Sequence, residues 1–467
     1  MSVNLTRYAP ADIETRQIIN ISGIFHLLQL HLMSNSNPSR KVGLLTATSL
    51  VVGNMIASGV FMLPATLSTF GGISLLGWII SCIGALCLAF VFAWLSKLRP
   101  IATGGPYAYV RDGMGDFAGY LVAWGYWISV VATNAAIAVA FVSYLGAFIP
   151  AIAQSSSLGI LTGLGAIWLL TWVNSRGIRE AGAMQVVTTI LKTAPLILIS
   201  VGGLFYLDSE HFIPFNASGE SDLSAITAST TLTLFAFLGL ECATIPSENI
   251  SNPEKTIAKA TIIGTLLTTV IYVLGTVAVM GILPPGVLKT SQAPFADAAA
   301  SIWGEPARYL VAGGAVIATF GALNGWILIQ GQMPMAAARD KLFPAVFQRE
   351  SKRGTPVLGI VLSSVLVSVL MGMNFSRSLA DTYKYMILLS TLTSLLAYSF
   401  SMPAYVIMLS RDKTLDKTDW LKIVVTIAGF IFSLWAIIGS GETIVYWGFI
   451  LVMAGIPFYA VMKLRRG

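Results

Sequence analysis

The chain has 467 residues, of which 55% are hydrophobic and only 10% are charged. Soluble domains carry about 25% charged residues, so this composition excludes a soluble enzyme. The formal net charge is +7, but no run of basic and aromatic residues resembles a nucleic-acid site, and no nucleic-acid partner is expected. The few cysteines and histidines lack metal-ligand spacing, so we expect no metal site and no cofactor.

Residues 1–40 differ from the rest and form an expected cytoplasmic N-terminal segment. Their apolar patch, "IINISGIFHLLQLHLM", is too short and too interrupted to cross a bilayer. It also lacks the basic leader and cleavage site of a secretory signal. Two interpretations stay open. Either the patch lies on the membrane surface, or Met33 is the true initiator and "MSNSNPSRKVGLL" leads directly into the first span.

From residue 42 onward, apolar stretches of about 20 residues recur, each long enough to cross a hydrocarbon core of roughly 30 Å. This pattern predicts an all-α integral membrane protein with about twelve transmembrane helices. The predicted spans are 42–64, 73–95, 117–148, 157–174, 184–206, 225–246, 258–283, 307–332, 356–373, 386–409, 420–438 and 444–462.

The basic residues predict the orientation of these spans. With both termini cytoplasmic, 23 of the 28 Lys and Arg residues fall on the inner side, four fall outside, and Lys192 lies within a span. The opposite orientation would invert that bias. Glu241 is the only acidic residue well inside a predicted span, and a carboxylate there should be protonated, hydrogen-bonded or paired.

The first ten spans divide into two sets of five, 41–224 and 225–410, and the last two spans lie in 411–467. An odd number of spans per half inverts the second half, which fits inverted-repeat transporters with interrupted helices at corresponding positions. The first span of each half is indeed irregular in sequence. The interrupting residues are Gly53, Asn54, Ser58 and Gly59 in span one, and Gly239, Glu241, Thr244 and Pro246 in span six.

Interrupted helices at mid-membrane indicate a ligand. Unwinding in hydrocarbon leaves amide and carbonyl groups without partners, at a cost of several kcal/mol each, so it persists only where a cavity or ligand satisfies them. A zwitterionic amino acid would do so. Its carboxylate would accept from amides at the positive end of one half-helix, and its ammonium would donate to carbonyls freed on the other. Gly59 would permit close backbone approach, and Ser58 would add a hydroxyl donor.

Five motifs carry a family resemblance: "GNMIASGVFMLPA", "TGGPYAYVRDGMG", "FLGLECATIPSENISNPEKTI", "APFADAA" and "GWILIQGQMPMAAARDKLFP". In this order they resemble the amino acid, polyamine and organocation transporter superfamily, and most of all bacterial basic amino-acid antiporters such as the arginine/agmatine antiporter. The resemblance implies a LeuT-type 5+5 inverted repeat plus two extra helices, and often a homodimer. It also implies a bacterial inner (cytoplasmic) membrane location and amino-acid or amine substrates. We interpret "TGGPYAYVRDG" as a cytoplasmic turn that starts span three.

The resemblance also implies the site residues, position by position. The substrate headgroup would be held by the span-one backbone at Met55, Ser58 and Gly59, with Asn54 supporting the break, and by carbonyls at Phe235 and Leu238. The side-chain pocket would comprise Ser129, Val130, Asn134, Ile137, Ser390 and Trp326. The gates would be Tyr126, Glu241 and Tyr398 on the cytoplasmic side, Phe235 as a lid and Trp326 in the middle. The arginine/agmatine exchanger has tryptophan at the position of Phe235 and a small polarisable residue at that of Val130, which puts arginine specificity in doubt.

Four of these residues have structural alternatives. Glu241 either titrates as a gate or bridges helices as a neutral acid. Lys192 either takes the place of the sodium ion that some relatives bind and carries a proton, or extends to the lipid headgroups. Trp326 either lines the pocket or packs as one more aromatic residue, and Asn134 either contacts substrate or bonds to a neighbouring helix.

The predicted function is therefore secondary active amino-acid transport. We expect an antiporter that exchanges a basic amino acid for its decarboxylated or metabolised product by alternating access, with no catalytic residues. The alternative is a proton-coupled symporter of neutral or broad-range amino acids, favoured by Lys192, Phe235 and Val130. An ion channel fits less well because the interrupted spans offer no repeated selectivity ring.

Overall fold

The computed structural model describes residues 42–100, 102, 104–176, 181–352, 354–373, 378–412 and 419–464. The predictions about residues 1–40 and Met33 lie outside the described residues. Within the described ranges the regular secondary structure is helical, and the β-type pairing there is an isolated bridge between Val42 and Ile250. Eleven helices in these ranges are long and apolar enough to cross a membrane. The prediction of an all-helical membrane protein is thus confirmed.

The helices fall along the chain as follows. The first group is α2 (Leu44–Met55), α3 (Gly59–Leu67), η1 (Gly71–Ile73), α4 (Ser74–Leu98), α5 (Pro106–Met114), α6 (Asp116–Leu145), α7 (Pro150–Gln154), α8 (Ser156–Ser175), α9 (Ala181–Gly202), η2 (Gly203–Tyr206) and η3 (Ser209–Phe212). The second group is α10 (Asp222–Leu234), η4 (Phe235–Phe237), η5 (Cys242–Thr244), η6 (Ser247–Asn249), α11 (Pro253–Ile282), α12 (Pro285–Leu288), α13 (Pro294–Trp303), α14 (Glu305–Arg339), η7 (Ala345–Gln348), α15 (Val357–Met373) and α16 (Leu379–Arg411). The last group is α17 (Trp420–Ile438), α18 (Glu442–Met453) and α19 (Gly455–Leu464).

Eleven of the predicted spans lie on these eleven membrane-length helices. The predicted span 356–373 lies on α15, a shorter apolar helix of 17 residues. At 1.5 Å per residue it extends about 26 Å, which is less than the roughly 30 Å hydrocarbon core. A twelfth span therefore remains a proposal.

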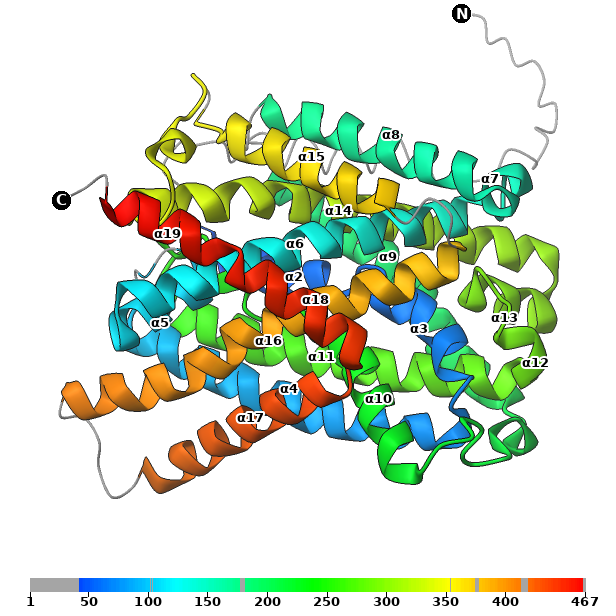
Figure 1. The fold of residues 1–467 in the computed structure, drawn as a ribbon. Coiled ribbons are helices and arrows are strands. Elements are labelled where there is room, and N and C mark those ends of the chain that lie inside the picture. The colour runs from blue at the N-terminus through cyan, green and yellow to red at the C-terminus, as the bar shows by residue number, and fades with distance from the viewer. Residues whose placement is uncertain are drawn as a thin grey trace, which may run out of the picture. The chain divides into compact units, whose positions relative to one another are not determined.

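The interrupted first span and α6 form the centre of the bundle. In the apolar 18-residue stretch of each span, the share of buried residues is 89% for Leu44–Leu67 and 83% for Asp116–Leu145. The corresponding shares are only 28% for Trp420–Ile438 and 22% for Glu442–Leu464. Figure 1 shows α6 beside α14 and α16, with α17 (orange) and α18–α19 (red) along the outside. The last two spans therefore expose large apolar side chains to the membrane rather than to the core.

The motif "TGGPYAYVRDG" forms more than the predicted turn. From Pro106 onward its residues lie in α5, a separate nine-residue helix with Pro106 in its first turn. Gly115 separates α5 from α6 and has a φ of +90°. Only glycine readily adopts this conformation, which interrupts the helical path. The interpretation of this motif as a simple turn was wrong.

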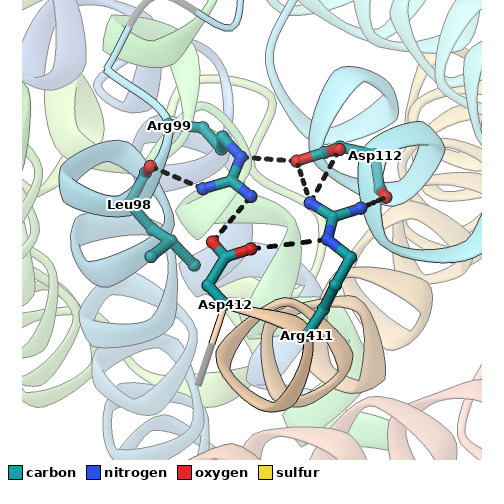
Figure 2. A network of polar contacts seen from close by, with 5 residues as sticks. All are labelled: Leu98, Arg99, Asp112, Arg411 and Asp412. Atoms are coloured by element: carbon teal, nitrogen blue, oxygen red, sulfur yellow. Dashed lines mark hydrogen bonds and ion pairs between the residues drawn. The ribbon is translucent and has the colours of Figure 1, made fainter. Parts of the chain in front are cut away.

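A network of four charged side chains joins α5 to the ends of α4 and α16 (Figure 2). Arg99 donates to Asp112 over 2.5 Å and forms an ion pair with Asp412 over 2.8 Å, and Arg411 pairs with Asp112 over 3.0 Å. The hydrogen bond from Arg99 holds the pKa of Asp412 below its usual range. These side chains therefore tie three helix ends together on one side of the bundle.

Candidate functional site

The first predicted interruption lies between α2 and α3. The helical path ends because Ile56 takes a ψ of 76°, outside the α region. The amide of Ile56 still donates to the carbonyl of Val52 over 2.8 Å, and the amide of Ala57 donates to that of Met55 over 2.8 Å. The break thus satisfies two of the four carbonyls that a helix end leaves without partners.

Side chains from two other helices satisfy the remaining two carbonyls. Lys192 of α9, which is fully buried, donates from Nζ to the carbonyl of Gly53. Trp326 of α14 donates from Nε1 to the carbonyl of Asn54 over 3.3 Å. Lys192 therefore places its amino group at the negative end of the α2 dipole and does not extend to a headgroup.

The second predicted interruption follows α10. After η4, Leu238 is extended with ψ of 131°, and Gly239 has φ of +106°. Only short 3₁₀ segments follow until α11 begins at Pro253. Because Leu238 leaves the helical conformation, its carbonyl turns away from the direction of the α10 hydrogen bonds.

The two interruptions pack directly on each other. A Cβ atom on Gly59 would lie 3.0 Å from the Cα and Cβ atoms of Ala236, closer than the 3.5–4.0 Å at which carbon atoms usually rest. A Cβ atom on Gly239 would lie 3.3 Å from that of Asn54. Glycine at both positions lets the backbones cross, so the beginning of α3 meets the end of η4.

Several polar groups near this crossing are buried without a hydrogen bond of standard geometry among the described residues. They are both side-chain atoms of the Asn54 amide and the hydroxyls of Ser58 and Tyr383. Oδ1 of Asn134 on α6, whose Nδ2 atom bonds to α14, is likewise buried without such a bond. The Tyr383 hydroxyl lies beside Ser58, and its ring packs edge-on against Phe235 with centroids 6.3 Å apart. The Asn54 amide lies beside the Cys242 thiol of the second interruption. Buried polar groups without partners cost about 1–3 kcal/mol each, so a ligand that pairs with them is favoured.

The three predicted cytoplasmic gate residues lie together. The carboxylate of Glu241 accepts from the hydroxyl of Tyr126 over 2.6 Å and from that of Tyr398 over 2.7 Å. The amide of Gly239 also donates to it over 3.3 Å. All three gate side chains are buried. Glu241 therefore joins α6, α16 and the second interruption through its two oxygen atoms.

Two predicted pocket residues bond to each other. Ser129 of α6 donates to the carbonyl of Ser390 on α16 over 3.0 Å and lies 2.5 Å from the Ser394 hydroxyl. Thr133 lies 2.6 Å from the Ser390 hydroxyl. This cluster of four hydroxyl residues holds α6 against α16, and the sequence had indicated only two of its members.

Asn134 makes an interhelical hydrogen bond. Its Nδ2 atom donates to Oε1 of Gln330 on α14 over 2.7 Å. The predicted pocket residues Val130 and Ile137, which lie with Asn134 on α6, are fully buried. Met55 and Leu238 are likewise buried beside the interruptions.

Besides Thr133 and Ser394, sequence reasoning missed Tyr383 and Gln330, which the structure also places in this region. Tyr383 lies just before the predicted span 386–409 and so was outside the predicted spans. Gln330 follows Trp326 by four residues, which puts both on one face of a helix. That spacing was a usable signal. Among the described residues, no group of three His, Cys, Asp or Glu side chains is arranged to hold a metal ion.

Comparisons with known proteins identify the family of the chain. A family model described as amino acid permease matches residues 42–457. The cadaverine/lysine antiporter of Escherichia coli K12 is 31% identical over 431 residues, which cover 90% of this chain and 95% of that protein. The putrescine transporter PotE of Haemophilus influenzae is 30% identical over 431 residues, covering 92% and 99%. A putative arginine/ornithine antiporter of Bacillus subtilis is 32% identical over 394 residues, covering 78% and 83%.

Proposed function

Since the chain belongs to the amino acid permease family and is thus a multi-pass membrane transporter rather than an enzyme, we propose that it is a secondary active antiporter. It exchanges a basic amino acid for the decarboxylated or metabolised product of that amino acid by alternating access. The family places its substrates among amino acids and polyamines. The names of the three relatives pair lysine with cadaverine, arginine with ornithine, or specify putrescine.

One structural observation carries the proposal. Where the two interrupted helices cross, buried polar side chains of α2 and α16 make no hydrogen bond of standard geometry among the described residues, and neither does Oδ1 of Asn134 on α6. An amino acid supplies both kinds of partner at once. Its carboxylate accepts from the Ser58 hydroxyl and from the first amides of α3, where the helix dipole is positive.

The ammonium group of the substrate belongs at the second interruption. The end of α2 is less suited to it, because Lys192 and Trp326 already donate to the carbonyls of Gly53 and Asn54. The extended conformation of Leu238 instead directs a backbone carbonyl away from the helical pattern. Phe235 then covers the bound molecule as a lid, and an aromatic face attracts a cationic group by about 0.5–2 kcal/mol.

Alternating access requires gates that open in turn. We assign the gate on the cytoplasmic side to Glu241 with its two phenol donors, Tyr126 and Tyr398. Because these bonds join the second interruption to α6 and α16, that side opens only when at least one of them breaks. Trp326, which bonds to Asn54, is the proposed middle gate.

The proposed architecture has twelve spans, with α15 as the ninth. The first inverted repeat is 41–224, the second is 225–410, and 411–467 adds two spans. Interruptions at the first helix of each repeat support this division. The bias of basic residues supports cytoplasmic termini in a bacterial inner membrane. We also propose a homodimer, by analogy with the family.

The alternative is a proton-coupled symporter of neutral or broad-range amino acids. It is favoured by the contact of buried Lys192 with the end of α2, since this lysine can couple its proton to the shape of the first interruption. Phe235 and Val130 also favour this alternative. A pocket with these residues is less suited to arginine than one with tryptophan and a small polarisable residue at the same positions.

Counterflow in proteoliposomes distinguishes the two functions. Vesicles preloaded with lysine, ornithine, arginine, cadaverine, putrescine or leucine are given external radiolabelled lysine. An antiporter takes up label only into vesicles that hold an exchangeable basic amino acid or amine. Uptake into empty vesicles driven by an imposed pH gradient would refute obligate exchange and support the symporter.

A further inference from the structure

Gln330, in the last third of α14, lies between Asn134 and helix α15. Its Oε1 atom accepts from Nδ2 of Asn134 over 2.7 Å. Its Nε2 atom donates to the carbonyl of Ile360 over 3.1 Å and to the hydroxyl of Ser364 over 2.7 Å. We propose that Gln330 is a positioning residue that fixes the orientation of the Asn134 amide, so that the site selects a substrate with a cationic side chain. This inference rests on the proposed function.

The orientation follows from the polarity of one backbone group. The Ile360 carbonyl can only accept a hydrogen bond, so the amide nitrogen of Gln330 must face it. The Ser364 hydroxyl donates its own proton to the same carbonyl over 2.9 Å and therefore accepts from Gln330. Oε1 of Gln330 must then face Asn134. Only the NH₂ end of Asn134 can pair with that oxygen.

A further contact holds the backbone of Gln330 and does not set the order of its side-chain bonds. The Ser363 hydroxyl donates to its backbone carbonyl over 3.0 Å and in turn accepts from Nε1 of Trp127 over 2.7 Å. Gln330 and Asn134 are both fully buried. Water therefore does not compete for these groups, and reversing Asn134 would place two acceptors against each other.

The consequence is that Asn134 offers an acceptor to the substrate. Its Oδ1 atom is buried without a partner among the described residues. Gln330 also follows Trp326 by one helical turn, and Trp326 bonds to the first interruption. An ammonium or amine at the end of a substrate side chain donates to Oδ1, whereas an apolar side chain leaves it unpaired. The oriented amide thus favours lysine over norleucine, which lacks the terminal amine.

The test compares lysine with norleucine as counterflow substrates. In Gln330→Met the Asn134 amide is free to reverse, so we expect the ratio of kcat/KM for lysine to that for norleucine to fall about tenfold or more, as expected for one hydrogen bond to a charged group. The change should lie mainly in the KM for lysine. Ser363→Ala is the matched control, because it removes a contact to the Gln330 backbone and leaves the side-chain order intact. Its ratio should stay within about twofold of wild type.

A rescue separates positioning from folding. In Gln330→Met with Asn134→Asp, both carboxylate oxygens accept, so the preference for lysine should return without Gln330. If Gln330→Met does not fold, Gln330→Glu tests the same point, because its carboxyl group still accepts from Asn134 and should retain the lysine preference. An unchanged ratio in Gln330→Met, an equal loss for both substrates in folded protein, or a tenfold loss of preference in Gln330→Glu would overturn the inference. A wild type that exchanges norleucine as well as lysine would instead refute the proposed function.

Discussion

The crossing of the two interrupted helices depends on a glycine, and Gly59→Ala tests this directly. The added methyl carbon would lie 3.0 Å from both Cα and Cβ of Ala236. Because one of these neighbours is a backbone atom, it cannot rotate aside, and the two segments must separate by about half an ångström to reach normal carbon contact. Overpacking of this kind costs about 1–3 kcal/mol. That is a fivefold or larger change in the ratio of folded to unfolded protein.

Gly165→Ala provides a control with the same chemical change. Gly165 lies in α8, and no heavy atom lies within 4 Å of a Cβ built on it. Alanine favours a helix over glycine by up to about 1 kcal/mol. The two substitutions should therefore have opposite effects on stability.

Both variants can be measured by equilibrium unfolding in lipid–detergent micelles with increasing SDS, and by lysine counterflow in proteoliposomes. We expect Gly59→Ala to lower the unfolding midpoint and to slow counterflow, because Ser58 and the beginning of α3 move away from η4. Gly165→Ala should lower neither the unfolding midpoint nor the counterflow rate. Equal midpoints and equal counterflow rates for the two variants would refute the packing argument.

Two further substitutions test the gate and the charged network. Tyr398→Phe removes one phenol donor to Glu241, and we expect folded protein with altered counterflow; a rate and KM equal to wild type would remove Tyr398 from the gate. Asp112→Asn breaks its ion pairs with Arg99 and Arg411, which are partly exposed and therefore screened by salt. The midpoint of this variant should fall at low salt and approach wild type in 1 M salt, where the screening length is about 3 Å. Since the pKa of Asp412 is lowered, its own ion pairs with Arg99 and Arg411 persist as pH falls until that lowered pKa is reached.

The membrane-spanning helices and both interruptions could be predicted from the sequence because their causes are local. Length and hydrophobicity indicate a span, and "GNMIASGVF" and "FLGLECATIPSENI" carry too many helix-breaking and polar residues for plain spans. The helix α5 was missed even though Pro106 and Gly115 bound it, because its nine residues were read only as a connection between two spans. The Arg99–Asp112 pair was missed as well, since the sequence alone does not show that the end of α4 lies close to α5.

The partners of the interrupted helices were decided only by the tertiary structure. The sequence placed Lys192 and Trp326 within spans, but their bonds to the carbonyls of Gly53 and Asn54 depend on the rotation and depth of α9 and α14 relative to α2. Asn134 was predicted as a pocket residue from its type and place, yet its partner Gln330 is 196 residues away in the chain. The sequence by itself thus determined where this protein crosses the membrane and where its helices break, because hydrophobic length and helix-breaking residues act locally. Which side chains complete those breaks was settled by helix packing, because composition leaves the rotation of each helix about its own axis undetermined.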